Sequence, residues 1–75
     1  MEGDLQIIVG KNLQAYRKAQ GLSQEAFAHE LGVHRTYMGS LERGERNLSL
    51  RSVERLAEQL GVHPIELLTQ LQPGN

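Results

Sequence analysis

Three hydrogen-bonding side chains, Arg35, Thr36 and Tyr37, follow one another near the start of the segment HRTYMGSLER. An arginine can donate two hydrogen bonds to O6 and N7 of guanine, and a threonine can contact a phosphate or the thymine methyl group. If this segment is a helix with its apolar residues turned inward, a face of polar and small residues remains. That outward face is expected to hold His34, Arg35, Thr36, Gly39, Ser40 and Arg43. Such a helix could enter the major groove of DNA.

Other reactive residue types form no catalytic or metal-binding pattern. His29, His34 and His63 are not spaced to share one face, and the chain has no cysteine. No Ser-His-Asp order, glycine-rich phosphate loop or close carboxylate pair is found. The mixed charges of ERGERN are those of an ordinary loop. We therefore expect no enzymatic activity, cofactor or metal.

Capping and helix-breaking residues divide the chain into five expected helices. Ser23 and Ser49 are good N-caps, Asp4 can cap the first helix, and Pro64 suits a first helical position. Gly residues follow the ends of the first, second and fourth segments. The expected ranges are 5–20, 24–31, 34–42, 50–60 and 64–71. No window alternates as a strand does, so an all-α fold is predicted.

Apolar residues at helical spacing on each segment predict one small core. They are Leu5, Val9, Leu13 and Tyr16; Phe27, Ala28 and Leu31; Met38 and Leu41; Leu50, Val53, Leu56, Ala57 and Leu60; and Ile65, Leu68 and Leu71. The 75 residues make a single domain, 1–75, with a core of about residues 5–71. So short a chain buries only about 60% of its unfolded surface, so helix packing or oligomerisation must stabilise it.

The joint between the second and third helices has the residues of a tight turn. Gly32 can adopt a positive φ there, and Ala28 is small enough for two helices to approach closely. Val33 then adds to the small core between the two helices. Gly32 and Ala28 would also suit any other helical hairpin.

Positive charge is confined to the middle of the chain. The formal net charge is −1, but all eight Lys and Arg lie between Lys11 and Arg55, with five of the nine acids, a net +3. This pattern is compatible with a local anion-binding face. No apolar run approaches the roughly 20 residues of a membrane span. The start MEGDLQ lacks the apolar stretch of a signal peptide, so a cytoplasmic protein is expected.

The segment QEAFAHELGVHRTYMGSLERG resembles the helix-turn-helix of the phage-repressor family, the Cro/cI or XRE-like DNA-binding domains. The similarity covers residues about 8–70 and includes Gln24, Ala28, Gly32, Val33, Met38 and Leu41. More narrowly, HRTYMGSLERGERNLSL resembles the controller proteins of restriction–modification systems. The resemblance implies a five-helix, lambda-repressor-like domain that regulates transcription by binding double-stranded DNA. With no second domain, no small-molecule effector is expected.

The resemblance also implies roles for individual residues. Arg35, Thr36 and Ser40 match base-reading positions, and Tyr37 beside them could reach a base or a phosphate. Gln24, Arg43 and Arg46 match phosphate contacts, with the helix N-terminus at Gln24 adding to the attraction. Arg17 and Glu42 match a salt bridge between the first and third helices. Phage repressors have Gln where this sequence has Arg35 and Thr36, so the operator sequence of phage repressors cannot be assumed for this protein.

Several alternatives stay open from the sequence. Arg35 could be an ordinary solvated arginine, Tyr37 could pack its ring on the domain edge, and the arginines 43, 46 and 51 could form a solvated face. Ile65, Leu68 and Leu71, with Leu67 beside them, either fill the monomer core or face a second subunit. One recognition helix reads few base pairs, so we expect a homodimer on an inverted-repeat operator. The alternative function is the antitoxin half of a toxin–antitoxin pair.

Overall fold

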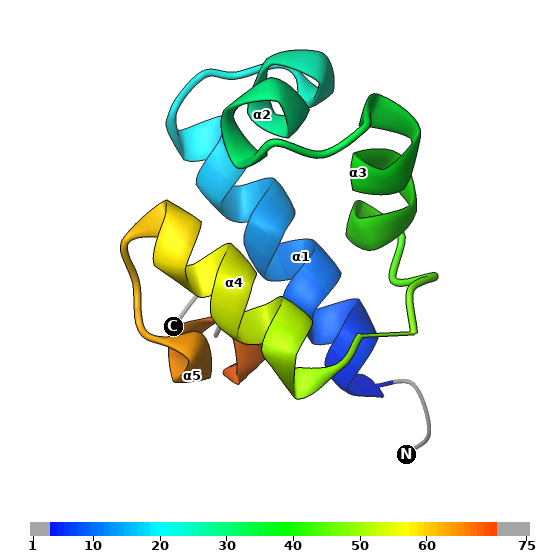
Figure 1. The fold of residues 1–75 in the computed structure, drawn as a ribbon, viewed down its shortest axis with the longest axis vertical. Coiled ribbons are helices and arrows are strands. Elements are labelled where there is room, and N and C mark those ends of the chain that lie inside the picture. Colours follow the sequence, from blue (N-terminus) through cyan, green and yellow to red (C-terminus); the bar gives the residue numbers. More distant parts are fainter. Residues whose placement is uncertain (1–3, 71–75) are drawn as a thin grey trace.

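The computed structural model describes residues 4–70, which contain five helices joined by loops and no strand (Figure 1). The helices are α1 (Asp4–Ala19), α2 (Gln24–Leu31), α3 (Arg35–Glu42), α4 (Leu50–Leu60) and α5 (Pro64–Leu68). The predicted all-α architecture is confirmed, and the bounds of α2 and α4 agree with the sequence. Helix α1 includes Asp4 and ends one residue earlier than expected, and α3 starts at Arg35 because His34 is its N-cap.

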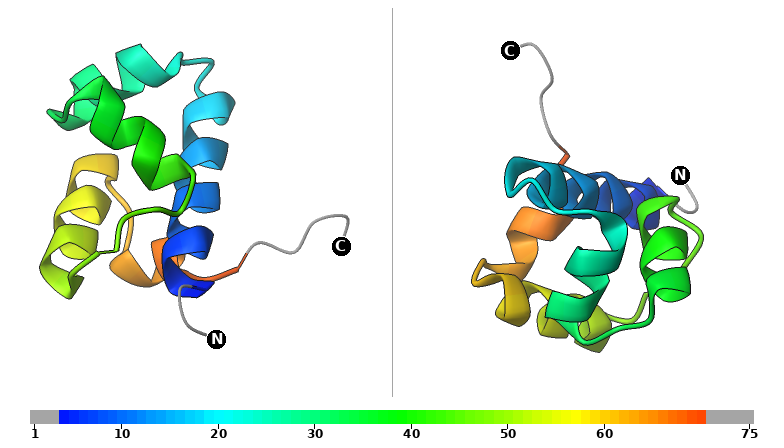
Figure 2. Two further views of the ribbon diagram at one scale, coloured as in Figure 1. Left: turned by 90° about the vertical axis from the view of Figure 1, so that its right-hand side faces the viewer. Right: turned by 90° about the horizontal axis from the view of Figure 1, so that it is seen from above.

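Helix α1 is the element around which the others are arranged. It packs against α3 and against α5, while α2 packs on α3 and α4 packs on α5 (Figures 1 and 2). Helix α2 also touches α4, which closes the core between the two halves of the chain. Helices α3 and α5 therefore rest directly on α1, and α2 and α4 pack on these two helices.

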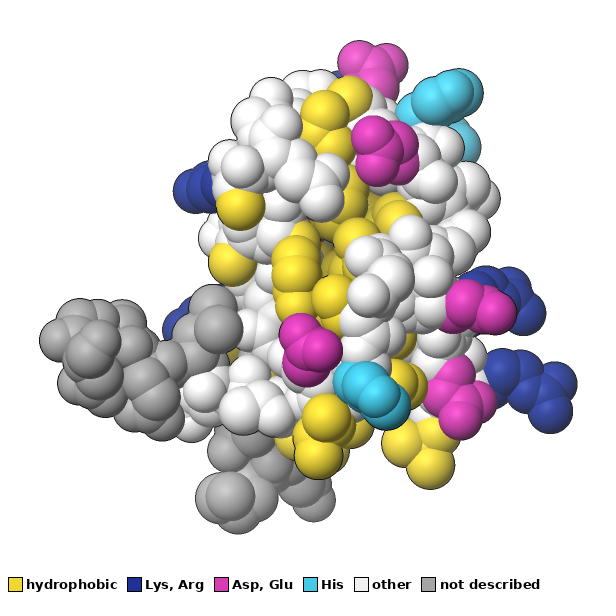
Figure 3. Space-filling view, turned by 90° about the vertical axis from the view of Figure 1, so that its left-hand side faces the viewer, with side chains coloured by type: hydrophobic (Ala, Val, Ile, Leu, Met, Phe, Trp, Pro, Cys, Tyr) yellow, Lys and Arg dark blue, Asp and Glu magenta, His cyan; other side chains and the backbone are white. Residues whose placement is uncertain are grey.

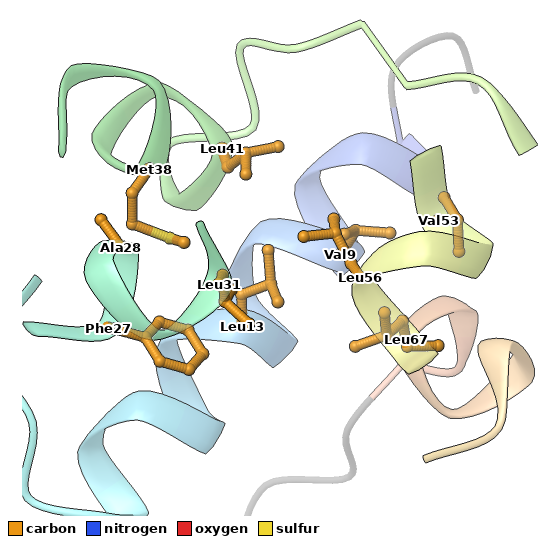
Figure 4. Close-up of a cluster of buried hydrophobic side chains, with 11 residues drawn as sticks. Val9, Leu13, Phe27, Ala28, Leu31, Met38, Leu41, Val53, Leu56 and Leu67 are labelled. Atoms are coloured by element: carbon orange, nitrogen blue, oxygen red, sulfur yellow. The ribbon is translucent and has the colours of Figure 1, made fainter. Parts of the chain in front are cut away.

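The core forms where the five helices meet (Figure 4). It contains Val9, Leu13, Phe27, Ala28, Leu31, Met38, Leu41, Val53, Leu56, Ala57 and Leu67. Two residues of α1 and α4 that were expected in the core are instead on the surface: Leu50, 78% exposed at the start of α4, and Leu5 in the first turn of α1. Each stands at a helix end, beyond the part of the helix that another element covers.

The short helix α5 differs most from its prediction. It ends at Leu68 because Thr69 has extended backbone angles, so the expected end at residue 71 is wrong; Leu71 itself lies outside the described residues. Its fully buried residue is Leu67, whereas Leu68 is half-buried and Ile65 is 67% exposed. The apolar face expected for this helix is therefore displaced by one residue.

The amide of Asn12 explains where α5 ends. This buried side chain donates from Nδ2 to the carbonyl oxygens of Leu67 at 2.7 Å and Thr69 at 3.0 Å, with a longer contact to Glu66 O at 3.2 Å. Carbonyls at a helix end lack intrahelical partners, and here a side chain of α1 supplies one.

Among the described residues, no helix has the length and apolar character needed to cross a membrane.

The predicted caps of α2 and α4 are confirmed. Ser23 Oγ accepts a hydrogen bond from Ala26 N at 3.0 Å, and Ser49 Oγ accepts one from Ser52 N at 3.1 Å. Such caps satisfy backbone donors that the first helical turn leaves free. They place the beginnings of both helices where the sequence indicated.

Candidate nucleic-acid interface

The turn between α2 and α3 has the geometry expected of a helix-turn-helix. Gly32 adopts a left-handed conformation with φ +70°, and Val33 N donates to Ala28 O at 3.0 Å. Ala28 is buried, and Val33 packs half-buried against the core. Met38 and Leu41 bury the inner side of α3, as predicted. The five structural residues named from the sequence thus do hold the two helices together.

The first turn of α3 points its side chains into solvent. Arg35 and Thr36 are both exposed, and so is the N-cap residue His34. His34 Nδ1 accepts a hydrogen bond from Thr36 N at 3.1 Å, so the imidazole of His34 caps the start of α3. The guanidinium of Arg35 and the hydroxyl of Thr36 are therefore available to an external partner.

Ser40 does not belong to this outward face. It is only 7% exposed, its hydroxyl donates to Tyr37 O at 2.7 Å, and the same oxygen accepts a bond from Arg46 Nε at 2.8 Å. Gly39 is buried as well. The expected outward orientation of Ser40 and Gly39 is wrong, because that side of α3 is covered by the loop that follows the helix and by Gln24 of α2.

Arg46 is held against α3 by two contacts. Besides its hydrogen bond to Ser40, its guanidinium carbon lies 4.8 Å from the centroid of the Tyr37 ring, which is cation–π geometry. Tyr37 is half-buried, so its ring packs on the domain while one face meets the arginine. These two contacts hold Arg46, an exposed residue of the loop, next to α3.

Gln24 and Arg43 flank Gly39 on the surface of α3. A Cβ atom at Gly39 would lie 3.4 Å from Gln24 Oε1 and 3.2 Å from Arg43 Nη1. Because Gly39 has no side chain, both polar groups can lie close to this point of α3. Arg43 Nε also lies 3.0 Å from Glu45 Oε2, but both side chains are mostly exposed, so this pair contributes little stability.

The expected ion pair between Arg17 and Glu42 is present. Arg17 donates from Nε to Glu42 Oε2 at 2.7 Å and from Nη2 to Oε1 at 3.1 Å. The Glu42 side chain is 2% exposed and that of Arg17 is 14% exposed. Glu42 Oε1 also accepts a hydrogen bond from Gln24 Nε2 at 3.1 Å. One carboxylate therefore links α1, α2 and α3 and orients the Gln24 amide.

Close backbone contacts between α1 and the end of α3 were missed from the sequence. A Cβ atom at Gly10 would collide with the carbonyl of Leu41 and lie 2.8 Å from Glu42 O. One at Gly44, where φ is +72°, would lie 2.9 Å from Ile7 Cγ1. A glycine inside a helix is destabilising compared with alanine, so Gly10 was the available signal of a close approach.

The chain belongs to the helix-turn-helix family HTH_3. The family model matches residues 13–67, which include all of α2, α3 and α4. Control protein C.SmaI of Serratia marcescens is 43% identical over 67 residues, covering 89% of this chain and 80% of the relative. Control protein C.BamHI of Bacillus amyloliquefaciens is 37% identical over 76 residues, covering all of this chain and 94% of the relative.

Two crystal structures resemble this helix-turn-helix domain. The restriction–modification controller protein C.AhdI from Aeromonas hydrophila has a TM-score of 0.69 and 44% identity, covering 83% of this chain and 94% of the other. The hypothetical transcription factor NHTF from Neisseria has a TM-score of 0.79 and 36% identity, covering 93% of this chain and 80% of the other. By family and by fold, the protein is an XRE-like, DNA-binding helix-turn-helix regulator.

Charge is unevenly distributed over this helix-turn-helix domain. The face that lies away from α3 carries acidic and apolar side chains, and its visible Lys and Arg stand at the edges (Figure 3). Arg35, Arg43 and Arg46 all belong to α3 or to the residues directly after it. The side of α3 is thus better suited to an anionic partner than the opposite face.

Proposed function

We propose that the protein is a controller-type transcriptional regulator that binds an inverted-repeat operator as a homodimer. The observation that carries the proposal is the arrangement around α3: Arg35 and Thr36 are exposed in its first turn, while Gln24 and Arg43 both lie close to Gly39. Base-reading groups and phosphate-contacting groups are thereby separated along one helix. Relatives that are control proteins support the controller role. This function requires no enzymatic step, cofactor or metal, and it would be carried out on DNA in the cytoplasm.

In this proposal α3 lies in the major groove with its first turn against the base edges. Arg35 would donate to guanine O6 and N7, and Thr36 would contact a neighbouring base or phosphate. Gln24 and Arg43 would contact phosphates and fix the register of the helix. Ser40 would contribute indirectly, because its hydroxyl holds Arg46, and Tyr37 would stand at the edge of the contact with that arginine.

The proposed dimer surface is an uncharged groove between the start of α1, the start of α4 and α5. It is lined by Leu5, Gln6, Val9, Leu48, Leu50, Val53 and Leu68. Because none of the described residues that line it is charged, two copies related by a two-fold axis would not bring like charges of these residues together there. Leu5 and Leu50 are its exposed apolar residues, and a second copy would remove both from water.

This groove includes only part of the interface predicted from the sequence. Leu68 lines the groove, but Ile65 lies outside its lining and Leu71 lies outside the described residues. A role for Ile65 and Leu71 stays a prediction. Two-fold pairing would set the recognition helices about 34 Å apart, so operator half-sites should be centred roughly 10 base pairs apart.

A gel shift with the DNA upstream of the protein's own gene tests the function. We expect a retarded band that survives excess random competitor DNA and depends on an inverted repeat. Leu50→Glu should place a charge in the proposed interface, yield monomers in sedimentation at micromolar concentration, and weaken operator binding. Leu50→Met is the matched control and should stay dimeric. A wild-type protein that is monomeric at this concentration and binds an asymmetric site would contradict the dimer.

A further inference from the structure

We infer that Gln6 is a positioning residue for DNA binding, because its amide holds the turn that carries Arg43 and Arg46. The inference rests on the proposed function, since those two arginines matter only if the loop after α3 meets DNA. Gln6 lies in the first turns of α1 and is far from α3 in sequence. Nothing in its local sequence marks it as part of the interface.

The contact is a single hydrogen bond on a tightly packed backbone. Gln6 Nε2 donates to Gly44 O at 3.2 Å, a partly buried contact across 38 residues. Gly44 rests directly on Ile7, since a Cβ atom there would lie 3.0 Å from Ile7 Cα. With φ at +72°, Gly44 is also the residue at which the chain reverses after α3. The turn is therefore seated on α1 by its backbone and held there by Gln6.

Other hydrogen bonds in this turn lead back to α3. Gly44 N donates to Leu41 O at 3.0 Å, and Glu45 N donates to Ser40 O at 3.0 Å. These bonds shape the turn but connect it only to α3. The Gln6 bond adds a partner on a different helix, so it fixes the direction of the turn relative to the rest of the domain.

The two residues that flank this turn both carry a guanidinium group. Arg43 precedes Gly44 and faces Gln24 across Gly39, while Arg46 follows and rests on Ser40 and Tyr37. A change in the direction of Gly44 would shift both groups with respect to the DNA backbone. Phosphate contacts set the register of a recognition helix, so their displacement weakens binding without removing any DNA-contacting atom.

Loss of the Gln6 donor should change the position of the turn after α3 more than the free energy of unfolding of the domain. The Gly44 carbonyl is only partly buried and can accept a hydrogen bond from water in its place. Gln6→Met has a similar length and no donor, and Gln6→Glu is isosteric and also lacks the donor. Gln59→Met changes an exposed glutamine of α4 in the same way and is the matched control.

Limited trypsin digestion reports on the turn without DNA. Both Gln6 variants should be cleaved after Arg43 and Arg46 about two- to tenfold faster than wild type, the range that one neutral hydrogen bond implies. Cleavage at other sites and the midpoint of urea unfolding should change little. Gln59→Met should match wild type throughout. Unchanged cleavage after Arg43 and Arg46 in both Gln6 variants would overturn the inference.

Operator binding then shows whether the positioning matters for recognition. Gln6→Met should weaken operator binding about two- to tenfold, and the loss should be smaller when Arg46 is already alanine. Because Gln6 also lines the proposed dimer groove, both variants are compared at a concentration where sedimentation gives the wild-type mass. Additive losses in Gln6→Met and Arg46→Ala would refute action through the turn. If wild type bound no operator, the proposed function would fail, whereas the trypsin rates would still decide the inference on Gln6.

Discussion

The two ends of α3 differ in almost every physical respect. At the N-terminal end, Arg35 and Thr36 are exposed and the helix is capped by the neighbouring His34. At the C-terminal end, Leu41 is buried and the carboxylate of Glu42 accepts hydrogen bonds from α1 and α2. In the proposed DNA complex, recognition and anchoring would therefore be separate tasks within one eight-residue helix. If the first turn reads DNA, its residues could vary with the operator sequence, whereas the residues of the last turn are required by the fold.

The largest expected effect comes from breaking the anchored end. Glu42→Ala should destabilise the domain by about 3 kcal/mol, because it leaves the mostly buried Arg17 without its carboxylate partner. Urea unfolding of both single mutants and the Arg17→Ala/Glu42→Ala double mutant measures the coupling. Glu45→Ala is the matched control: its pair with Arg43 is exposed, so its loss should stay below about 1 kcal/mol. Additive losses for Arg17 and Glu42 would mean that the pair does not contribute as a unit.

A change in the first turn of α3 should instead weaken DNA binding and leave the free energy of unfolding unchanged. Arg35→Ala should weaken operator binding by about 1–3 kcal/mol and relax selectivity at one base position in each half-site. Its free energy of unfolding should match wild type, because the side chain is exposed. Competition between operator and random DNA measures the first effect and urea unfolding the second. Arg55→Ala, an exposed arginine of α4, is the control; equal losses on operator and random DNA would reduce Arg35 to a phosphate contact.

Gly10→Ala tests how closely α1 packs against the last turn of α3. Alanine is the better helix former by about 1 kcal/mol, but its Cβ would collide with the last turn of α3, so we expect a net loss of about 1–2 kcal/mol. The reverse change at a surface position, Ala15→Gly, should lose about 1 kcal/mol from helix propensity alone. Thermal unfolding of both variants separates packing from propensity. A stabilised Gly10→Ala protein would show that α1 and α3 can move apart freely.

The smallest expected effect concerns Arg43, the C-cap residue of α3. Arg43→Gln should weaken binding to all DNA sequences similarly and lower the magnitude of the salt slope by about one unit per subunit. Titrations at several ionic strengths measure the slope, and Gln24→Ala provides the comparison, because an uncharged side chain displaces no counterion. The same slope in wild type and Arg43→Gln would exclude a phosphate contact by this arginine.

Local signals were sufficient to predict much of the fold. Ser23 and Ser49 begin α2 and α4 because each caps a backbone donor, and Gly32 and Gly61 end them in left-handed conformations. Such signals depend on a few neighbouring residues and can be read from them directly. The end of α5 depends instead on Asn12, whose acceptors lie about 55 residues away. No local pattern contains that information.

Helical periodicity predicted the exposure of some proposed site residues but not the burial of others. The exposure of Arg35 and Thr36 follows from the periodicity of α3, which turns Met38 and Leu41 inward. Ser40 was placed outward because it is polar, but the loop returns over it and brings Arg46 onto its hydroxyl. The path of a loop is set by tertiary contacts such as the one from Gln6 to Gly44. Periodicity cannot reveal such contacts.

The Asn12 amide also bears on the order in which the chain acquires its structure. Its acceptors on Glu66, Leu67 and Thr69 belong to the last residues of the described fold, so this closure joins segments of great sequence separation. Contacts of that kind form late, because the entropy of the intervening loop must be overcome first. Contacts between α1 and α3 span fewer residues, such as the 25 between Arg17 and Glu42. Leu68, one wall of the uncharged groove, takes its place only when α5 has docked. The proposed dimer surface would therefore depend on a longer-range closure than the packing of α3 on α1 does.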